Sequence, residues 1–329
     1  MKYNEVVYMK PLIRSMIATV FLGVPLTVQA QAYPSKPVHL VNQFQPGASG
    51  DISSRIIAQS LTKIIGQPVV VENRAGGAGT VAAAYVAKSD ADGHTLLYAT
   101  SGIVTNKFLA KSQEFDALEA LTPVAQISRP IVCFVVNTKF PAGSLKELIE
   151  YAKRNPGKVI YGTSGIGSPH HFSGEQIKLL TGANLVHLPY KASAQALLDT
   201  VAGQIPATFS IYSVTLPQIQ AGKVRVLAVV SEKRVPQLPD TPTVEEVVPG
   251  FEEPPSWTGV FAPVKAQPAL LRRISGDFVK ALNDVETRAK LEAGGSEINV
   301  GTPEQFAATV KRGVALTETI IKSAGIKLR

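Results

Sequence analysis

Strand-like and helix-like segments alternate along almost the whole chain, and glycines stand at the ends of several helix-like segments. Residues 38–44 have the pattern of a strand, and residues 52–65 place apolar side chains at helical spacing before Gly66. Further strand-like segments follow at 69–72, 95–99, 159–163, 185–188, 207–210 and 224–230, and further helix-like segments follow at 80–88, 168–181 and 193–202. Because parallel strands need crossover helices, this alternation predicts an α/β fold with mainly parallel sheets flanked by helices.

Capping signals mark further helices. Ser144 and Glu147 form a capping box, and Thr302 with Gln305 forms another before a helix that runs to about Ala324. Pro268 stands at a first-turn position. The prolines between 236 and 255 indicate a connector rather than a domain core.

Two turns rich in glycine and serine each follow a strand-like segment and precede a helix-like one. They read Gln45-Pro46-Gly47-Ala48-Ser49-Gly50-Asp51 and Thr163-Ser164-Gly165-Ile166-Gly167-Ser168-Pro169. A helix N-terminus carries free N–H groups and a partial positive charge, so either turn can hold a small anion. The alternative is that these residues simply start helices well. Both turns lie at the carboxyl ends of strands, where α/β sheets bind ligands, and this favours anion binding.

The first 32 residues have the pattern of an export signal. Lys2, Lys10 and Arg14 precede an uncharged apolar run, residues 16–28, and small residues then allow cleavage after Ala30 or Ala32. A membrane anchor is the alternative, but the run is short for a span of about 20 residues. We therefore expect a periplasmic protein.

The net charge of +8 is spread over the chain, with no lysine or arginine run longer than two and no interleaved aromatics. We therefore expect no nucleic-acid partner. Cys133 is the only cysteine, so the exported chain has no internal disulfide. Its apolar strand-like setting predicts an inert core thiol.

Motifs for catalysis and cofactors are missing or weak. Gly77-Ala78-Gly79 only opens a dinucleotide fingerprint, since Ala82 stands at the third glycine position. The five histidines lack the spacing of metal ligands, and Ser164 lacks the flanking glycines of a hydrolase elbow. We expect no metal, no cofactor and no enzymatic activity. A triad assembled in space would not be visible in the sequence.

The chain resembles the Bug-type solute-binding proteins, the periplasmic receptors associated with tripartite tricarboxylate transporters. The resemblance covers almost all of residues 33–329. It is carried by these segments: 33–38 (YPSKPV), 44–51, 69–74 (VVVENR), 92–97 (DGHTLL), 100–102, 151–153, 155–158 (NPGK), 187–191 (HLPYK), 221–225 (AGKVR), 238–244 (LPDTPTV) and 324–327 (AGIK).

The resemblance implies a two-lobed, type II-like periplasmic-binding-protein fold that closes around one ligand, with two hinge crossings. It implies that residues 1–32 are the signal peptide, 33–130 plus 252–329 the first lobe, and 131–251 the second. Family ligands are small carboxylates, including dicarboxylates, tricarboxylates, amino acids and aromatic acids. We expect a monomer that delivers its ligand to membrane subunits of a tripartite tricarboxylate transporter. A receptor that feeds a sensor kinase is the alternative, and an exported enzyme on the same fold is a further one.

The resemblance also implies where the ligand binds. Family loops of this kind hold one carboxylate from the first lobe and meet the ligand from the second. The candidate ligand-binding residues are Phe44, Gln45, Gly47, Ala48, Ser49, Gly50, Asp51, Thr100, Ser101, Thr163, Ser164, Gly165, Gly167, Ser168, His171, Tyr190, Ala192 and Ser210. Asp51 is expected to act as a helix cap more than as a ligand contact. His171 has two open interpretations, a packed histidine or a ligand contact.

Two departures from the family pattern bear on specificity. The first turn usually carries more prolines and two glycines, whereas Gln43, Gln45 and Ala48 stand here. Family members frequently have an aspartate at the position where Ser210 stands here. Without that aspartate, a ligand ammonium group has no carboxylate to pair with at this position, and a second ligand carboxylate meets no repulsion from one. This predicts a ligand without an amine, a dicarboxylate or an aromatic carboxylate. Phosphate-like anions are disfavoured by the resemblance.

Overall fold

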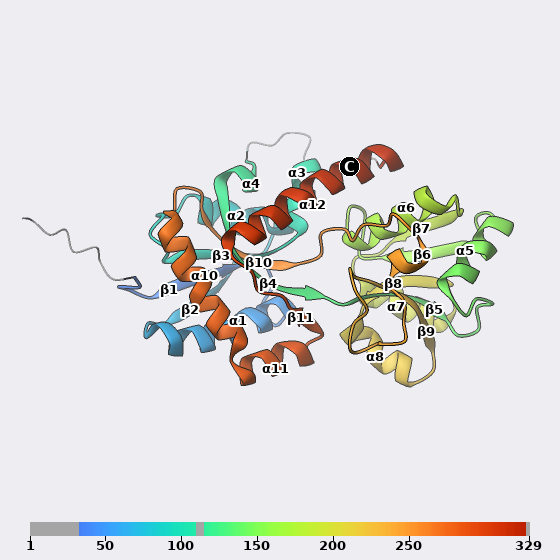
Figure 1. The fold of residues 1–329 in the computed structure, drawn as a ribbon, viewed down its shortest axis with the longest axis horizontal. Coiled ribbons are helices and arrows are strands. Elements are labelled where there is room, and N and C mark those ends of the chain that lie inside the picture. The colour runs from blue at the N-terminus through green and yellow to red at the C-terminus, as the bar shows by residue number, and fades with distance from the viewer. Residues whose placement is uncertain (1–32, 110–114, 327–329) are drawn as a thin grey trace, which may run out of the picture. The chain divides into compact units, whose positions relative to one another are not determined.

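The computed structural model describes residues 33–109 and 115–326, whose strands form two sheets (Figure 1). The predicted signal peptide, residues 1–32, lies outside the described residues. The first sheet consists of β1 (Val38–Asn42), β2 (Val69–Asn73), β3 (Thr95–Thr100), β4 (Leu121–Pro130), β10 (Thr258–Pro263) and β11 (Ser296–Ile298). The second consists of β5 (Val132–Asn137), β6 (Val159–Thr163), β7 (Leu185–Pro189), β8 (Ala207–Ile211) and β9 (Val224–Val230). The strand orders are β11-β4-β10-β3-β1-β2 and β7-β6-β8-β5-β9.

Both sheets are mixed, which corrects the expectation of mainly parallel pairing. The pairs β1–β2, β1–β3, β6–β7 and β6–β8 are parallel. Strands β4, β10 and β11 of the first sheet, and β5 and β9 of the second, pair antiparallel. The antiparallel strands include β4, β5, β9 and β10, which flank the two places where the chain passes from one sheet to the other. A hydropathy pattern reveals a strand but not its direction, so this part of the pairing was not visible in the sequence. The α/β fold class itself is confirmed.

Helices cover both faces of each sheet. Those of the first sheet are α1 (Ser49–Ile65), α2 (Thr80–Ala87), α3 (Gly102–Leu109), α4 (Ala117–Ala120), α10 (Pro268–Asn283), α11 (Val285–Ala293) and α12 (Pro303–Ala324), together with a 3₁₀ turn, Gly77–Gly79. Those of the second are α5 (Leu145–Arg154), α6 (Pro169–Thr181), α7 (Ser193–Ala202), α8 (Tyr212–Gln220) and α9 (Val244–Val247). Alternate residues of β3 enter different cores: Leu96 packs with α1 and α10, whereas Leu97 packs with α2, α3 and α12.

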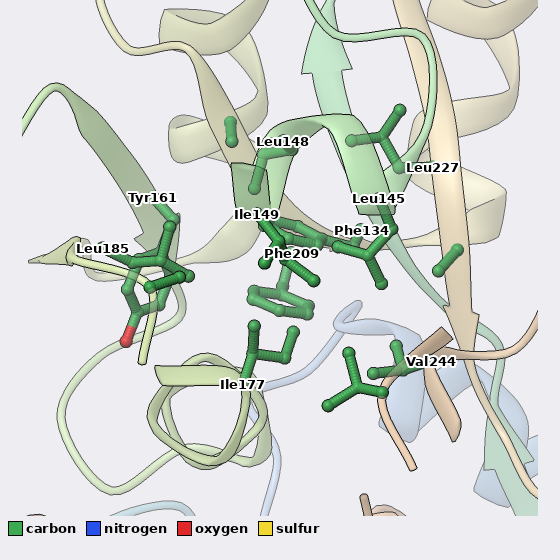
Figure 2. Packing of buried hydrophobic residues seen from close by; sticks show 14 of the residues in the cluster. Phe134, Leu145, Leu148, Ile149, Tyr161, Ile177, Leu185, Phe209, Leu227 and Val244 are labelled. Carbon is green, nitrogen blue, oxygen red and sulfur yellow. The ribbon is translucent and has the colours of Figure 1, made fainter. Parts of the chain in front are cut away.

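The core of the second sheet is built around two stacked rings (Figure 2). Phe134 of β5 and Phe209 of β8 lie opposite each other in register, with ring centroids 4.1 Å apart and planes at 4°. Helices α5, α6 and α9 close this core, and Leu145 and Ile177 are among the side chains that they contribute. Cys133 faces the other side, towards α7 and α8, and burial raises the pKa of its thiol to about 12. The expected core position of this thiol is confirmed.

The chain passes between the sheets twice. The first crossing is Ile131, between β4 and β5. The second runs through residues 231–257, where Phe251 still packs in the second core and Trp257 already packs in the first. The division into lobes at 130/131 and 251/252 stays a prediction. Within the described residues, no helix has the length and apolar character needed to cross a membrane.

Candidate functional site

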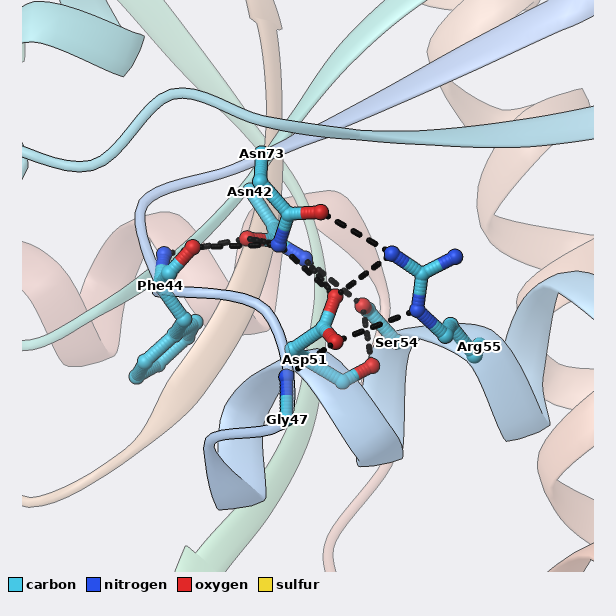
Figure 3. Close-up of polar contacts among 7 residues, drawn as sticks. All are labelled: Asn42, Phe44, Gly47, Asp51, Ser54, Arg55 and Asn73. Atoms are coloured by element: carbon cyan, nitrogen blue, oxygen red, sulfur yellow. Dashed lines mark hydrogen bonds and ion pairs between the residues drawn. The ribbon is translucent and has the colours of Figure 1, made fainter.

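The first turn is held by a buried carboxylate, Asp51, in the first turn of α1 (Figure 3). Its Oδ2 accepts hydrogen bonds from the backbone N–H of Gly47 at 2.9 Å and from Arg55 Nε at 3.1 Å. Its Oδ1 accepts from Asn73 Nδ2 at 2.7 Å and from Asn42 Nδ2 at 3.1 Å. Burial by itself raises the pKa of Asp51, but these hydrogen bonds outweigh burial and hold the pKa well below its usual range.

Asp51 is therefore fully occupied by the protein's own donors. The expectation that Asp51 caps the helix is wrong, because Ala48 is the N-cap residue of α1 and Asp51 instead accepts from the N–H of Gly47, which precedes the helix. The left-handed backbone of Gly47, with φ 81°, directs that N–H at the carboxylate. Gly50 is needed for packing, because a Cβ there would overlap the ring of Phe44. The turn is thus held by hydrogen bonds to Asn42 and Asn73 where it meets the sheet.

The N-terminus of α1 is left uncapped by the described residues. Its N-cap residue, Ala48, has no side chain able to accept a hydrogen bond. Ser49 and Gly50 follow, and their N–H groups have no protein acceptor among the described residues. Gln45, Gly47 and Ser49 are exposed. These free N–H groups, together with the helix dipole, are suited to an anion.

Gln43, which follows β1, links the end of that strand to the end of β3. This residue was not among the predicted site residues. Its Nε2 donates to Thr100 Oγ1 at 3.0 Å, and its Oε1 is buried without a partner in the described structure. Thr100 Oγ1 also accepts from the N–H of Gly102 at 3.3 Å. Ser101 is buried, and its N–H donates to the carbonyl of Trp257. The only signal in the sequence was that Gln43 interrupts the family pattern of the turn.

The second turn satisfies most of its own polar groups. Ser168 caps α6 by accepting from the N–H of His171 at 3.2 Å, and its hydroxyl donates to Gly165 O at 2.7 Å. The N–H of Gly167 is bonded to His171 Nδ1 at 3.2 Å, and Gly165 N donates to Thr163 Oγ1 at 3.2 Å. This N-terminus offers fewer free donors than that of α1.

Three histidines lie beneath this turn. The His171 and His187 rings stack with centroids 3.9 Å apart, and His187 Nε2 lies 2.7 Å from Thr163 Oγ1. His170 Nδ1 lies 3.1 Å from Ser164 Oγ. Burial lowers the pKa of His170 to about 4 and, with the charges of His171 and Lys178, that of His187 to about 3. Burial likewise lowers the pKa of His171, while the nearby Glu175 carboxylate raises it. His171 is packed and bonded in this structure, while its role towards a ligand stays a prediction.

The remaining predicted residues come from neighbouring strand ends. The Tyr190 hydroxyl donates to Asp199 Oδ2 at 2.8 Å, and burial followed by that carboxylate raises the pKa of Tyr190 to about 12. Ala192 is the N-cap residue of α7 and, like Ala48, provides no side-chain cap. Ser210 lies opposite Cys133 in the second sheet, and its hydroxyl is fully buried with no partner in the described structure.

The structure thus gathers each half of the predicted site at the carboxyl edge of its own sheet. Among the described residues, no hydrogen bond or ion pair joins the first turn to the second. Ile52 and Ile166, beside the two turns, are 52% and 48% exposed. Residues 33–109 and 115–326 contain no group of three or more histidine, cysteine, aspartate or glutamate side chains that could hold a metal ion.

The comparisons with known proteins agree with this architecture. A family model described as the tripartite tricarboxylate transporter family receptor matches residues 53–326. Protein BugT of Bordetella pertussis is 32% identical over 310 residues, which are 93% of this chain and 95% of BugT. The structure of R. palustris Rpa4515 with adipate is 35% identical with a TM-score of 0.75, and the match covers 89% of this chain and 99% of that one. The structure of the periplasmic binding protein BugD is 32% identical with a TM-score of 0.70, over 90% of this chain and 99% of that one.

Two sheets joined by two crossings, with helix N-termini at the strand ends, define a protein with the periplasmic-binding-protein fold. The chain belongs to the tripartite tricarboxylate transporter receptor family, the family of BugT. This family consists of solute-binding receptors rather than enzymes.

Proposed function

We propose that the protein is a periplasmic, monomeric receptor that captures a small carboxylate between two lobes. It then delivers the carboxylate to a tripartite membrane transporter. The lobes comprise residues 33–130 with 252–329, and residues 131–251. The ligand is a dicarboxylate or an aromatic carboxylate. Family membership supports a solute-binding role, and the relative Rpa4515 was solved with adipate, a dicarboxylate.

The observation that carries the proposal is the uncapped N-terminus of α1. Several helices satisfy this end with a side chain, as Ser168 does for α6 and Thr302 does for α12, whereas α1, α2, α7, α8 and α10 do not. At α1 the cap position is Ala48, and the nearby carboxylate of Asp51 is used to hold the turn. A ligand carboxylate would supply the missing acceptor there, and Arg55 compensates the charge of Asp51.

A second carboxylate needs a second set of donors, and α7 offers one. Its cap position is Ala192, and the N–H of Ser193 has no protein acceptor among the described residues. The polar groups of the neighbouring α6 turn are largely hydrogen-bonded to one another through Ser168. We therefore assign the second carboxylate to the α7 end of the predicted site, with the α6 turn and His171 forming its wall.

The absence of an acidic residue at position 210 supports a ligand without an amine. Ser210 is a buried neutral hydroxyl, so the second lobe provides no carboxylate at this strand end to pair with an ammonium group. Because position 210 is not an aspartate, the second carboxylate of a dicarboxylate meets no like charge there. Calorimetry with adipate and with L-aspartate compares the two classes directly. Tight binding of L-aspartate alone would overturn this ligand assignment.

The α1 contact can be tested with a proline at the first helical position. Ser49→Pro removes one free N–H group, and proline is well tolerated at that position of a helix. We expect adipate affinity to fall roughly tenfold, the scale of one charge-assisted hydrogen bond, while the unfolding midpoint hardly changes.

The matched control is Val285→Pro, which places the same residue at the start of α11 on an 83% exposed position. It should leave adipate affinity unchanged. Equal affinities of the Ser49→Pro variant and the unchanged protein would show that α1 does not hold the ligand.

Uptake and sensing begin with the same capture step and differ in the partner. Radiolabelled adipate uptake by cells that lack the gene separates them. Loss of uptake supports delivery to a transporter. Normal uptake with a lost transcriptional response to adipate would assign the receptor to a sensor kinase instead. Turnover of the bound acid by purified protein would indicate an enzyme.

A further inference from the structure

The loops at one edge of the second sheet carry most of the net charge of the protein. β5 runs antiparallel to both β8 and β9, so its end meets the start of β9. β6, β7 and β8 begin at this same edge, whereas the predicted ligand residues of this sheet lie at the opposite edge, where these strands end. The segments that form the edge are 138–158, which include α5, 182–184, 203–206 and 221–225.

The charge at this edge is strongly positive. Its segments contain seven lysine and arginine residues and two glutamates, a net charge of +5. Of the 33 basic and 25 acidic residues in the chain, residues 1–32 hold three and one, which leaves residues 33–329 with a net charge of +6. All but one unit of that excess therefore lies at this edge. We call its seven exposed cationic residues the basic edge: Lys139, Lys146, Lys153, Arg154, Lys158, Lys223 and Arg225.

Contacts between the segments make the basic edge one continuous surface. Arg225 Nη1, at the start of β9, donates to the carbonyl of Ala142 in the loop before α5 at 3.1 Å. In the same loop, the ring of Phe140 packs edge-on against Tyr151 of α5, with ring centroids 5.0 Å apart. The cations on α5, on the loop before it and at the start of β9 therefore belong to one face.

Few carboxylates offset these cations. Glu147 accepts from the backbone N–H of Gly143 at 2.6 Å, and Glu150 Oε1 lies 3.6 Å from Lys153 Nζ. Within residues 33–109 and 115–326, no ion pair involves the four remaining lysines of the basic edge, which are Lys139, Lys146, Lys158 and Lys223. Their charge is thus open to an anionic partner.

The matching edge of the first sheet shows that the fold does not require such an excess. There β1, β2 and β3 begin, and the segments before them, 33–37, 66–68 and 88–94, contain two lysines and two aspartates. Lys36 Nζ lies 2.9 Å from Asp92 Oδ2. One sheet thus has a balanced edge and the other an unbalanced one, which points to a binding role for the second.

The composition of the basic edge suits a lipid surface better than a protein. Five of its seven cations are lysines, a residue type that protein interfaces disfavour, whereas arginine and aromatic residues are enriched there. Lysine is a compact charge on a flexible stem, able to follow phosphate groups that move within a bilayer. None of the large apolar side chains that are exposed among the described residues lies in these segments. The contact is therefore electrostatic, without insertion of large side chains into the bilayer.

We propose that the basic edge binds the headgroups of anionic phospholipids and so holds the protein at the surface of a membrane that borders the periplasm. The predicted ligand residues of the second sheet remain free in this arrangement, because they lie at its opposite edge. The inference rests on the proposed periplasmic location and not on the identity of the ligand. Each basic side chain near an anionic surface raises the membrane partition coefficient roughly fivefold. Salt weakens the attraction, since the Debye length falls from about 10 Å at 0.1 M to about 3 Å at 1 M.

The test is sedimentation with phospholipid vesicles, using protein purified from the periplasm. Vesicles of pure phosphatidylcholine are compared with vesicles that contain about 30% phosphatidylglycerol, at about 50 mM and about 500 mM NaCl. We expect binding to the phosphatidylglycerol vesicles at low salt, and little binding to them at high salt or to pure phosphatidylcholine. No binding to phosphatidylglycerol vesicles at low salt would refute the proposal.

Two triple variants with the same net charge separate this edge from the charge of the whole protein. Removing three cations of the edge should weaken vesicle binding roughly hundredfold, by the combined changes Lys139→Gln, Lys146→Gln and Lys223→Gln. The matched control removes three exposed lysines elsewhere and should keep its affinity within about twofold, by the changes Lys88→Gln, Lys265→Gln and Lys311→Gln. Arginine at the three edge positions should preserve binding. Equal losses in both glutamine variants would refute a role for the edge.

A protein partner gives a different result. Membrane vesicles prepared from the same bacterium are tested before and after protease treatment. Binding that survives the treatment supports the lipid assignment. Binding that disappears with the membrane proteins, together with no binding to the pure lipid vesicles, would assign the basic edge to an acidic membrane protein and overturn it.

Adipate calorimetry separates this proposal from the proposed function. The edge variant should bind adipate as the unchanged protein does, because its substitutions lie away from the predicted ligand residues. If adipate and other carboxylates fail to bind while the vesicles bind as expected, the ligand proposal fails and the basic edge stands. If adipate binds and the vesicles do not, the basic edge fails and the ligand proposal stands.

Discussion

Asp51→Asn tests whether one buried carboxylate holds the first ligand turn. The change conserves size and removes the charge. An asparagine keeps one oxygen and places an NH₂ group at the position of the other. If that oxygen takes the place of Oδ1, the Asn42 and Asn73 amides keep their acceptor, but the NH₂ group faces the N–H of Gly47 and Arg55 Nε. If the amide is reversed, the two asparagine amides lose their acceptor instead.

The magnitude follows from these partners. Either orientation sets two donors of the protein against an NH₂ group, and a buried unsatisfied donor costs about 1–3 kcal/mol. The Arg55 pair adds little, because that side chain is 52% exposed. We expect the free energy of unfolding to fall by about 3 kcal/mol, and adipate affinity to fall as the turn loosens. The pKa of Asp51 is depressed, so its stabilisation is present above pH 4 and is lost only as pH falls towards its folded pKa.

Urea denaturation at pH 7.5, followed by calorimetry with adipate, measures both effects. Asp277→Asn is the matched control. Asp277 is equally buried, but its hydrogen bond comes from Arg273 on the same helix, a 58% exposed side chain. This control should lose about 1 kcal/mol or less and keep its affinity. A loss below about 1 kcal/mol for Asp51→Asn would show that the turn does not depend on the carboxylate.

Three further predictions concern acid stability, packing and the second lobe. Burial lowers the pKa of His170 to about 4, so on acidification the unfolded chain binds a proton at this residue before the folded chain does, and the free energy of unfolding should fall by roughly 3 kcal/mol between pH 6.5 and 4. Urea denaturation of His170→Gln over this pH range should show a correspondingly smaller fall. Equal pH dependence in the variant and the unchanged protein would contradict this. Gly50→Ala should destabilise the protein by about 1–3 kcal/mol through overlap with Phe44, whereas Gly276→Ala, with open space around it in α10, should stabilise it by about 0.5–1 kcal/mol; thermal melts of the pair decide, and equal shifts would count against the packing argument. Ser210→Asp should place a carboxyl group in a fully buried position without a protein donor and lower stability by several kcal/mol at pH 8, less at pH 4; unchanged stability at pH 8 would mean that the side chain reaches solvent or a cation.

Much of the secondary structure could be predicted because local signals mark its ends. The helices before Gly66 and Gly182 end as expected, and the segments 159–163, 193–202 and 224–230 agree to the residue. Strand β4 and helix α8 were missed. Each contains proline, at Pro123 and Pro217, and neither has a clear apolar period. Their places are decided by packing against distant strands, which no local pattern records.

The site shows the same division between local and distant information. The turn around Gly47 and the cap at Ser168 were visible as short patterns. The hydrogen-bond partners of Asp51 were not visible. Asn73 lies at the end of β2 and approaches Asp51 of α1 only when β2 pairs with β1. The stacking of His187 on His171 likewise joins β7 to α6. A single sequence gives the type of a side chain at a strand end, but not which strand end lies next to it.

The two sheets differ in how the chain supplies them, and this bears on the order in which they form. All strands of the second sheet come from one continuous stretch, residues 132–230, whereas β10 must return to pair with β3, where Thr258 lies opposite Thr100. Closing that long loop before the intervening residues are compact costs chain entropy without local contacts to offset it. A folded second sheet shortens the loop to its two crossings. In pulse-labelled hydrogen exchange during refolding, β5 to β9 should therefore gain protection before β10. Folding of the second sheet would then bring the two segments of the first sheet close enough to pair.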